Sequence, residues 1–272
     1  MIQVLTVDAY SGFLAFMGEG AKAGAQPIFI GRIVWPGDDQ PSDAVIKLYK
    51  IDTCGIANEA IGFAANRARG VMQPEKGAVL LLTREAMPDL GLDIEEYIDK
   101  ETGVCACWAT SFEQGAEPFK FIRRLSTFSQ KQSDAFYKSK FCKLLAGVDY
   151  VTGNSDRHEG NFLYKDDLKY LAIDQGCVGG GLTWHKMWPD PSPRNEISIL
   201  AQENLGSSHL AEWQTGAILE YEIAQQGWSK ILDDIAKSLP GLLDADGISS
   251  IIDYMTGRAT GSEFAVSCGR LI

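Results

Sequence analysis

The feature that most constrains the fold is a change of hydrophobic periodicity near residue 112. Before it, short β-rich runs and glycine or proline turns surround one run at helical spacing, and after it most runs are helical. The expected strands cover 2–7, 27–35, 44–49, 78–83, 104–112, 161–164 and 170–173. The expected helices cover 56–70, 92–100, 129–150, 195–204, 207–226, 228–238 and 247–257. This order predicts an α+β chain with a β-rich part over 1–112, a mainly helical part over 113–272, and a hinge near 110–115.

The run A-V-I-K-L-Y over 44–49 predicts a strand with Ala44, Ile46 and Leu48 on one face and Lys47 on the other. A lysine among apolar residues is costly unless its ammonium reaches solvent or a partner. Glu59, on the helix that follows, is the candidate partner and would hold Lys47 in place as an ion pair. An edge lysine that reaches solvent and a solvent-facing glutamate are the alternatives.

Charge and apolar patterning exclude several classes of protein. Asp plus Glu (36) outnumber Lys plus Arg (25), and the formal net charge is −11, so we expect no direct nucleic-acid partner. No uncharged apolar run reaches the roughly 20 residues of a membrane span, and the first residues lack the basic and apolar regions of a signal peptide. The cysteines form no Cys-x-x-Cys pair, and Cys105 and Cys107 share one face of a strand. We expect buried thiols and a cytoplasmic protein without a membrane partner.

One segment carries residues suited to phosphoryl transfer. It runs G-N-S-D-R-H-E-G-N-F-L-Y over 153–164 and is followed by L-A-I-D-Q-G over 171–176. Asp156 can accept the proton of an attacking hydroxyl, while Asn161 and Asp174 can hold Mg²⁺ against ATP phosphates. Asn161 and Asp174 flank one predicted β-ribbon at its two chain ends, where they can converge. Turn or capping roles are the alternative for all three residues.

The D-R-H-x-x-N pattern followed by I-D-x-G resembles the catalytic and metal-binding loops of HipA-like kinases. The wider superfamily with the phosphatidylinositol 3- and 4-kinases shares D-R-H-x-x-N. The resemblance extends to Lys47 and to the helix that begins A-N-E, and it implies a two-lobed protein-kinase-like fold. By resemblance, Asp156 is the catalytic residue, Asn161 and Asp174 bind Mg²⁺, and Lys47 contacts the α- and β-phosphates of ATP.

Other candidate site residues follow from the same resemblance. His158 would neutralise charge on the transferred phosphate or share the role of base, with bracing of the loop as the alternative. Gly18 and Gly20 would let main-chain N–H groups approach phosphate, with a flexible hairpin as the alternative. No hydroxyl residue lies between Gly12 and Pro27, so we do not expect a loop serine that switches the enzyme off. ATP would lie near the hinge, at Ser111 and Phe112.

Tryptophans mark the later part of the chain. The segment 176–193 occupies the position of an activation loop, and its Trp184 and Trp188 either form a substrate platform or close a core. Trp213 and Trp228 fit the cores of helices. The run of three glycines over 179–181 predicts a mobile loop.

The sequence therefore favours an ATP- and Mg²⁺-dependent kinase that acts on a serine or threonine of a protein. The HipA-like resemblance leaves room for an antitoxin or another regulatory partner protein, as in a toxin–antitoxin pair. Two alternatives stay open. One is a pseudokinase that binds nucleotide or a partner without turnover, and the other is a kinase for a small molecule or lipid head group.

Overall fold

The computed structural model describes residues 2–17, 26–91, 93–125, 129–165, 169–186 and 195–270. The chain is α+β, as the sequence predicts, and it divides into two units. The sheet unit comprises Ile2–Ile56 and Pro74–Gln114, and the helical unit comprises Ala57–Gln73 and Gly115–Ile272. The helix that carries Glu59 thus belongs to the helical unit, although it lies within the β-rich part of the sequence.

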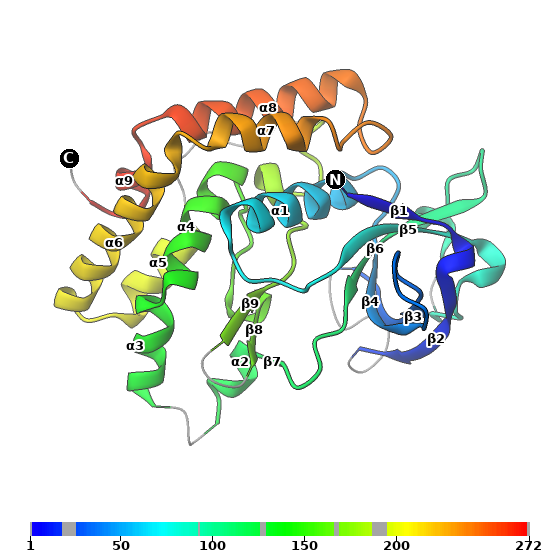
Figure 1. Ribbon diagram of the computed structural model, residues 1–272, viewed down its shortest axis with the longest axis horizontal. Coiled ribbons are helices and arrows are strands. Elements are labelled where there is room, and N and C mark those ends of the chain that lie inside the picture. The colour runs from blue at the N-terminus through cyan, green and yellow to red at the C-terminus, as the bar shows by residue number, and fades with distance from the viewer. Residues whose placement is uncertain are drawn as a thin grey trace. The chain divides into compact units, whose positions relative to one another are not determined.

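The sheet unit is built on a six-stranded mixed sheet of order β1-β5-β6-β4-β3-β2 (Figure 1). β1 runs parallel to β5, and the other neighbouring strands pair antiparallel. The strands are β1 (Gln3–Leu5), β2 (Tyr10–Phe16), β3 (Ile28–Ile33), β4 (Ser42–Leu48), β5 (Gly77–Thr83) and β6 (Val104–Ser111). β4 lies in the interior of the sheet, so Lys47 is not an edge lysine.

The core of the sheet unit follows the alternation of its strands. Ala44, Ile46 and Leu48 of β4 are fully buried on one face, as predicted. Cys105 and Cys107 of β6 join the same cluster, with their Sγ atoms 3.7 Å apart. Burial of these apolar side chains on one face fixes the register of β4 and β6, because a slip by one residue would turn them to the other face.

The predicted helix over 92–100 is wrong. Leu92 lies outside the described residues, and the rest forms a 3₁₀ turn at Glu95–Tyr97 followed by a β-bridge from Ile98 to Cys105. Acidic side chains compete for the main chain here, since Asp93 Oδ1 accepts the N–H of Glu95 at 3.0 Å. These local hydrogen bonds favour turns over a regular helix.

In the helical unit, α4 is the central helix and is in contact with its neighbours on several sides. Figure 1 shows α7 and α8 running side by side. Trp213 and Trp228 are buried, as predicted. The helices are α1 (Gly55–Arg69), α2 (Phe119–Ile122), α3 (Gln130–Lys138), α4 (Lys140–Thr152), α5 (Glu196–Asn204), α6 (Ser207–Gln225), α7 (Trp228–Ala236), α8 (Ala245–Thr260) and α9 (Phe264–Ser267).

Three details of the helices differ from expectation. The single helix predicted over 129–150 is two helices, because Ser139 is extended (ψ 153°) and its Oγ accepts the N–H of Cys142 at 3.1 Å as the N-cap of α4. Ser129 caps α3, with a capping box to Gln132. The short helices α2 and α9 have no counterpart in the predicted elements.

A second, three-stranded sheet of order β7-β8-β9 supports the site. Its strands are β7 (Glu117–Pro118), β8 (Phe162–Lys165) and β9 (Lys169–Ala172), all antiparallel. Phe162 pairs with Ala172 in the β8–β9 ribbon. A buried aromatic cluster in which Phe136 touches Phe119, Phe162 and Tyr170 holds this ribbon against α2 and α3.

Candidate functional site

The loop between α4 and β8 presents its residues alternately inward and outward. Gly153 ends α4 in the left-handed conformation (φ 67°), which favours glycine. Asp156 and His158 are exposed, whereas Arg157 between them is 1 % exposed. The two candidate chemical groups, Asp156 and His158, therefore lie on the solvent side of the loop. We call the segment from Gly153 to Asn161 the catalytic loop, because it holds the residues that the sequence predicts to be catalytic.

Arg157 ties this loop to the structure beneath it. Its guanidinium donates to both carboxylate oxygens of Asp149 on α4, at 2.8 and 3.0 Å. It also donates to the carbonyl oxygen of Ile173 at 2.6 Å and to Oε1 of Gln175 at 2.6 Å. Burial raises the pKa of the Asp149 carboxyl, and the ion pair with Arg157 counteracts that rise. Arg157 therefore holds the loop against α4 and the main chain around Asp174.

Asn161 is bonded to the main chain of Asp156. Its Nδ2 donates to the carbonyl oxygen of Asp156 at 2.6 Å, and its side chain is buried. This bond fixes which way the carboxamide faces, because the amide nitrogen is held toward the loop. The other end, Oδ1, accepts no hydrogen bond from the described residues and remains available as an oxygen ligand.

Asp174 lies at the same end of the ribbon as Asn161. The N–H of Ile173 donates to the carbonyl oxygen of Asn161 at 3.1 Å, one step beyond the pairing of Phe162 with Ala172. Asp174 then turns away with φ 62°, the only positive φ of a non-glycine residue in the described ranges. Aspartate adopts a positive φ more readily than most residues, which allows this sharp turn directly after β9. The predicted convergence of Asn161 and Asp174 is thus consistent with the register.

Helix α1 fixes the turn that follows Asp174. Oε2 of Glu59 accepts the N–H of Gln175 at 3.0 Å, and Glu59 is 2 % exposed. Gly62 lies directly against the same glutamine, since a Cβ there would be 2.4 Å from the Cβ of Gln175. Only glycine permits this approach, so α1 can lie close enough for Glu59 to reach the turn. The alternative of a solvent-facing Glu59 is wrong.

Asn58 holds the glycine-rich segment after the turn. Its Nδ2 donates to the carbonyl oxygens of Gly176 at 2.6 Å and Gly181 at 2.9 Å, and its Oδ1 accepts the indole N–H of Trp184 at 2.8 Å. Trp184 is buried, so it closes a core and is not a substrate platform; Trp188 lies outside the described residues. Sequence reasoning gave Asn58 and Gln175 no role, and the nearest signal was the A-N-E at the start of α1.

The remaining candidates belong to the sheet unit. Lys47 lies on β4 opposite Ile28 and Trp108, with its Nζ 5.9 Å from the centre of the Tyr49 ring. Its pairing with Glu59 stays a prediction. Ser111 ends β6, where its Oγ accepts the N–H of Lys76 at 3.2 Å.

The other residues predicted to contact ATP are Phe112, Gly18 and Gly20. Phe112 is exposed, and its N–H donates to the carbonyl oxygen of Asp43 at 3.0 Å. Gly18 and Gly20 lie outside the described residues. The contacts of these residues with ATP stay predictions.

The donor set suits a magnesium ion better than a transition metal. Within the described residues, no group of three or more His, Cys, Asp or Glu side chains is arranged to hold a metal. Asn161 and Asp174 instead offer an amide oxygen and a carboxylate. Mg²⁺ prefers hard oxygen ligands and is commonly held by one or two protein groups together with water and nucleotide phosphates. The two residues therefore fit a Mg²⁺ ion that arrives with its nucleotide.

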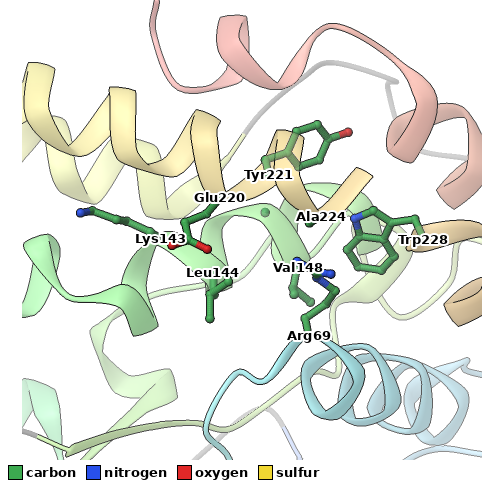
Figure 2. Close-up of a pocket in the computed structure, with 9 residues that line it drawn as sticks. Arg69, Lys143, Leu144, Val148, Glu220, Tyr221, Ala224 and Trp228 are labelled. Atoms are coloured by element: carbon green, nitrogen blue, oxygen red, sulfur yellow. The ribbon is translucent and has the colours of Figure 1, made fainter. Parts of the chain in front are cut away.

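Two cavities of very different size lie among the described residues of the helical unit. The first has a free volume of about 10 Å³ and lies between Arg69, Glu220, Tyr221 and Trp228 (Figure 2). It holds at most one water, which would satisfy the buried indole N–H of Trp228, unpaired within the described residues. The second has a volume of about 440 Å³ and borders the catalytic loop at His158, Glu159 and Gly160. Only the second is large enough for a ligand.

No protein-family model matches the chain, and no curated protein matches its sequence. No helix in the described ranges combines the length and the apolar character that crossing a membrane requires. The function must therefore be inferred from the chain's own residues and their geometry.

Proposed function

We propose that this chain is an ATP- and Mg²⁺-dependent kinase that transfers the γ-phosphate to a serine or threonine hydroxyl of a protein. The observation that carries the proposal is the 2.6 Å hydrogen bond from Asn161 Nδ2 to the carbonyl oxygen of Asp156. It joins the candidate base and a candidate metal ligand, and Asp174 follows at the same end of the ribbon. The motif resemblance to HipA-like kinases, which rests on the same residues, points to the same class.

Each residue has a defined task in this proposal. Asp156, exposed on the catalytic loop, accepts the proton of the acceptor hydroxyl. The hydroxyl oxygen forms a bond to the γ-phosphorus while the bond from that phosphorus to the bridging oxygen of ADP breaks. Oδ1 of Asn161 and the carboxylate of Asp174 would hold Mg²⁺, which when bound neutralises charge on the phosphates. Lys47 would bind the α- and β-phosphates.

The scaffold explains how these groups keep their positions. Arg157 fixes the catalytic loop to α4 and to the main chain just before Asp174, and Glu59 fixes the main chain just after it. Phosphoryl transfer depends chiefly on positioning and electrostatics, so a loop anchored from both sides suits it.

The test is Mg²⁺-dependent nucleotide binding by Asp174→Ala. We expect Mg-ATP to raise the melting temperature of the wild type, because binding to the native state stabilises it. ATP with a chelator should raise it much less. Asp174→Ala should lose the Mg²⁺-dependent part, while Asp253→Ala, an exposed aspartate on α8, should behave as the wild type. Equal Mg²⁺-dependent binding by Asp174→Ala and the wild type would refute the metal assignment.

A further inference from the structure

The 440 Å³ cavity beside the catalytic loop, here called the loop-side cavity, has no role in the proposed nucleotide site. It lies wholly within the helical unit, between α2, α5 and the catalytic loop. Its volume is within the range of ligand-binding pockets. It is lined by Lys120, Arg123, His158, Glu159, Gly160, Leu200, Glu203 and Asn204.

The cavity adjoins the solvent side of the catalytic loop. Because Asp156 and His158 are exposed while Arg157 between them is buried, both face away from the scaffold. His158 lines the cavity, so a molecule seated there contacts the loop two residues beyond Asp156, the candidate base. The Nδ1 of His158 accepts the N–H of Gly160 at 2.9 Å, which places the proton of the neutral ring on Nε2 as a donor.

Two of the charges in the wall satisfy each other. Arg123 forms an ion pair with Glu159 and donates to Oδ1 of Asn204 at 2.9 Å. Glu159 is also within 3.5 Å of the hydroxyl of Tyr137. This pair is therefore part of the wall and has little net charge to offer a ligand.

Two opposite charges remain on different elements. Lys120 on α2 and Glu203 on α5 are both exposed and form no ion pair with any described residue. Lys120 is close to the loop, since a Cβ at Gly160 would be 3.3 Å from its Cδ. A ligand whose charges complement both residues carries a negative group near Lys120 and a positive group near Glu203.

We propose that the loop-side cavity binds the acceptor segment of a polypeptide and selects a serine or threonine flanked by one basic and one acidic side chain. The inference rests on the proposed kinase function, for which it names the acceptor class. A peptide matches the cavity because its side chains supply separated charges and its main-chain carbonyls can accept from His158 Nε2.

The experiment measures peptide binding without ATP, by fluorescence polarisation of labelled short peptides. One probe has lysine before and glutamate after a central serine, and a second has these charges exchanged. Two further probes carry two lysines or two glutamates. We expect the wild type to prefer one mixed-charge probe over both like-charged probes by about 3- to 10-fold, less at high salt, because such exposed pairs are individually weak.

Charge exchange in the wall should redirect this preference. Lys120→Glu should favour the two-lysine probe, and Glu203→Lys the two-glutamate probe. The double variant K120E/E203K should favour the mixed probe of opposite orientation. The matched controls are Lys230→Glu on α7 and Glu222→Lys on α6, exposed positions outside the cavity wall, which should keep the wild-type preference. Melting temperatures verify that every variant is folded.

The outcomes separate this inference from the proposed function. If Mg-ATP binds but no probe binds, or if the exchanges leave the preference unchanged, the cavity is not the acceptor site and the kinase proposal is unaffected. If the charge preference follows the exchanges while Mg-ATP neither binds nor is consumed, the peptide site is supported and the kinase proposal fails.

Discussion

Arg157 and Asp149 form an ion pair whose side chains are both almost completely buried, with Nε to Oδ2 at 2.8 Å and Nη2 to Oδ1 at 3.0 Å. The same guanidinium donates to the main chain at Ile173, immediately before Asp174. One buried cation therefore connects α4, the catalytic loop and the end of the ribbon. Loss of either partner would leave the other as an uncompensated buried charge.

We expect Asp149→Asn to lower the free energy of unfolding by roughly 3–5 kcal/mol, the usual cost of breaking a buried ion pair. Arg157→Lys should lose most of the same stability, because an ammonium cannot make the planar two-point contact with a carboxylate. Urea unfolding measures both. The exposed pair of Lys237 and Asp234 supplies the control, since Asp234→Asn should change stability by less than about 1 kcal/mol. Equally small effects at both sites would contradict the anchoring role of Arg157.

Asn161→Asp is a sharper test of the proposed metal site. A carboxylate is a better ligand for Mg²⁺ than an amide oxygen, yet we expect this variant to bind Mg-ATP more weakly. Asn161→Asp adds a carboxylate but replaces the Nδ2 donor that lies 2.6 Å from the carbonyl oxygen of Asp156 with a repelling oxygen. The lost hydrogen bond costs roughly 1–3 kcal/mol, so we expect Mg-ATP affinity to fall about tenfold or more. Titration of fluorescent ATP against Mg²⁺ checks this. A gain in Mg-ATP affinity would show that the added carboxylate charge next to the metal matters more than the lost hydrogen bond that orients the loop.

Asp156 separates a kinase from a pseudokinase. Asp156→Asn is nearly isosteric and exposed, so the fold and the Mg-ATP melting shift should survive. Removal of the base should lower phosphate transfer by about 10²–10⁴-fold. Transfer is measured by mass spectrometry of protein, lipid and small-molecule acceptors. If the wild type binds ATP but transfers phosphate to none of these acceptors, the result favours the pseudokinase alternative. If Asp156→Asn keeps the wild-type rate, the assignment of Asp156 as the base is wrong.

Hydrophobic periodicity predicted strands and helices correctly where an element buries only one of its faces. The period-two alternation of β4 predicted its buried face correctly, because Ala44, Ile46 and Leu48 all lie on the side of the strand that packs into the core. The same reasoning failed over 129–150, where apolar spacing continues through Ser139 although its hydroxyl caps a new helix. A serine in mid-pattern was the available signal, and its competition with the main chain overrode periodicity.

The sequence predicted only the part of the candidate site whose residues lie close together in the chain. The order of Asp156, Asn161 and Asp174 around a ribbon is a local property, and the register agrees with it. The bonds from Asn58 to Gly176 and from Gln175 to Glu59 join residues more than a hundred positions apart in the chain, and no periodicity specifies such contacts. The cavity wall from α2 and α5 is likewise a product of tertiary packing, so Lys120 and Glu203 carried no signal in the sequence.

The buried thiols of the helical unit should make the protein unstable in alkali. Burial raises the pKa of Cys142 and of Cys268 from 9.0 to about 12. Between these values the unfolded chain has lost the thiol protons that the folded chain keeps, so the unfolded state binds fewer protons and stability falls as the pH rises. Below pH 9 this contribution to stability is fully present.

We expect the free energy of unfolding to decline by about 1 kcal/mol per pH unit for each thiol above its unfolded pKa. Urea unfolding between pH 9 and 10, before most tyrosines ionise, measures this slope. The variant C142A/C268A should have a shallower slope whatever its absolute stability, because the linked protons are gone. Cys177, the only cysteine that is not buried, should react first with a thiol reagent in the native protein. An unchanged slope in C142A/C268A, or equally fast labelling of Cys142, would show that these thiols are not protected by the fold.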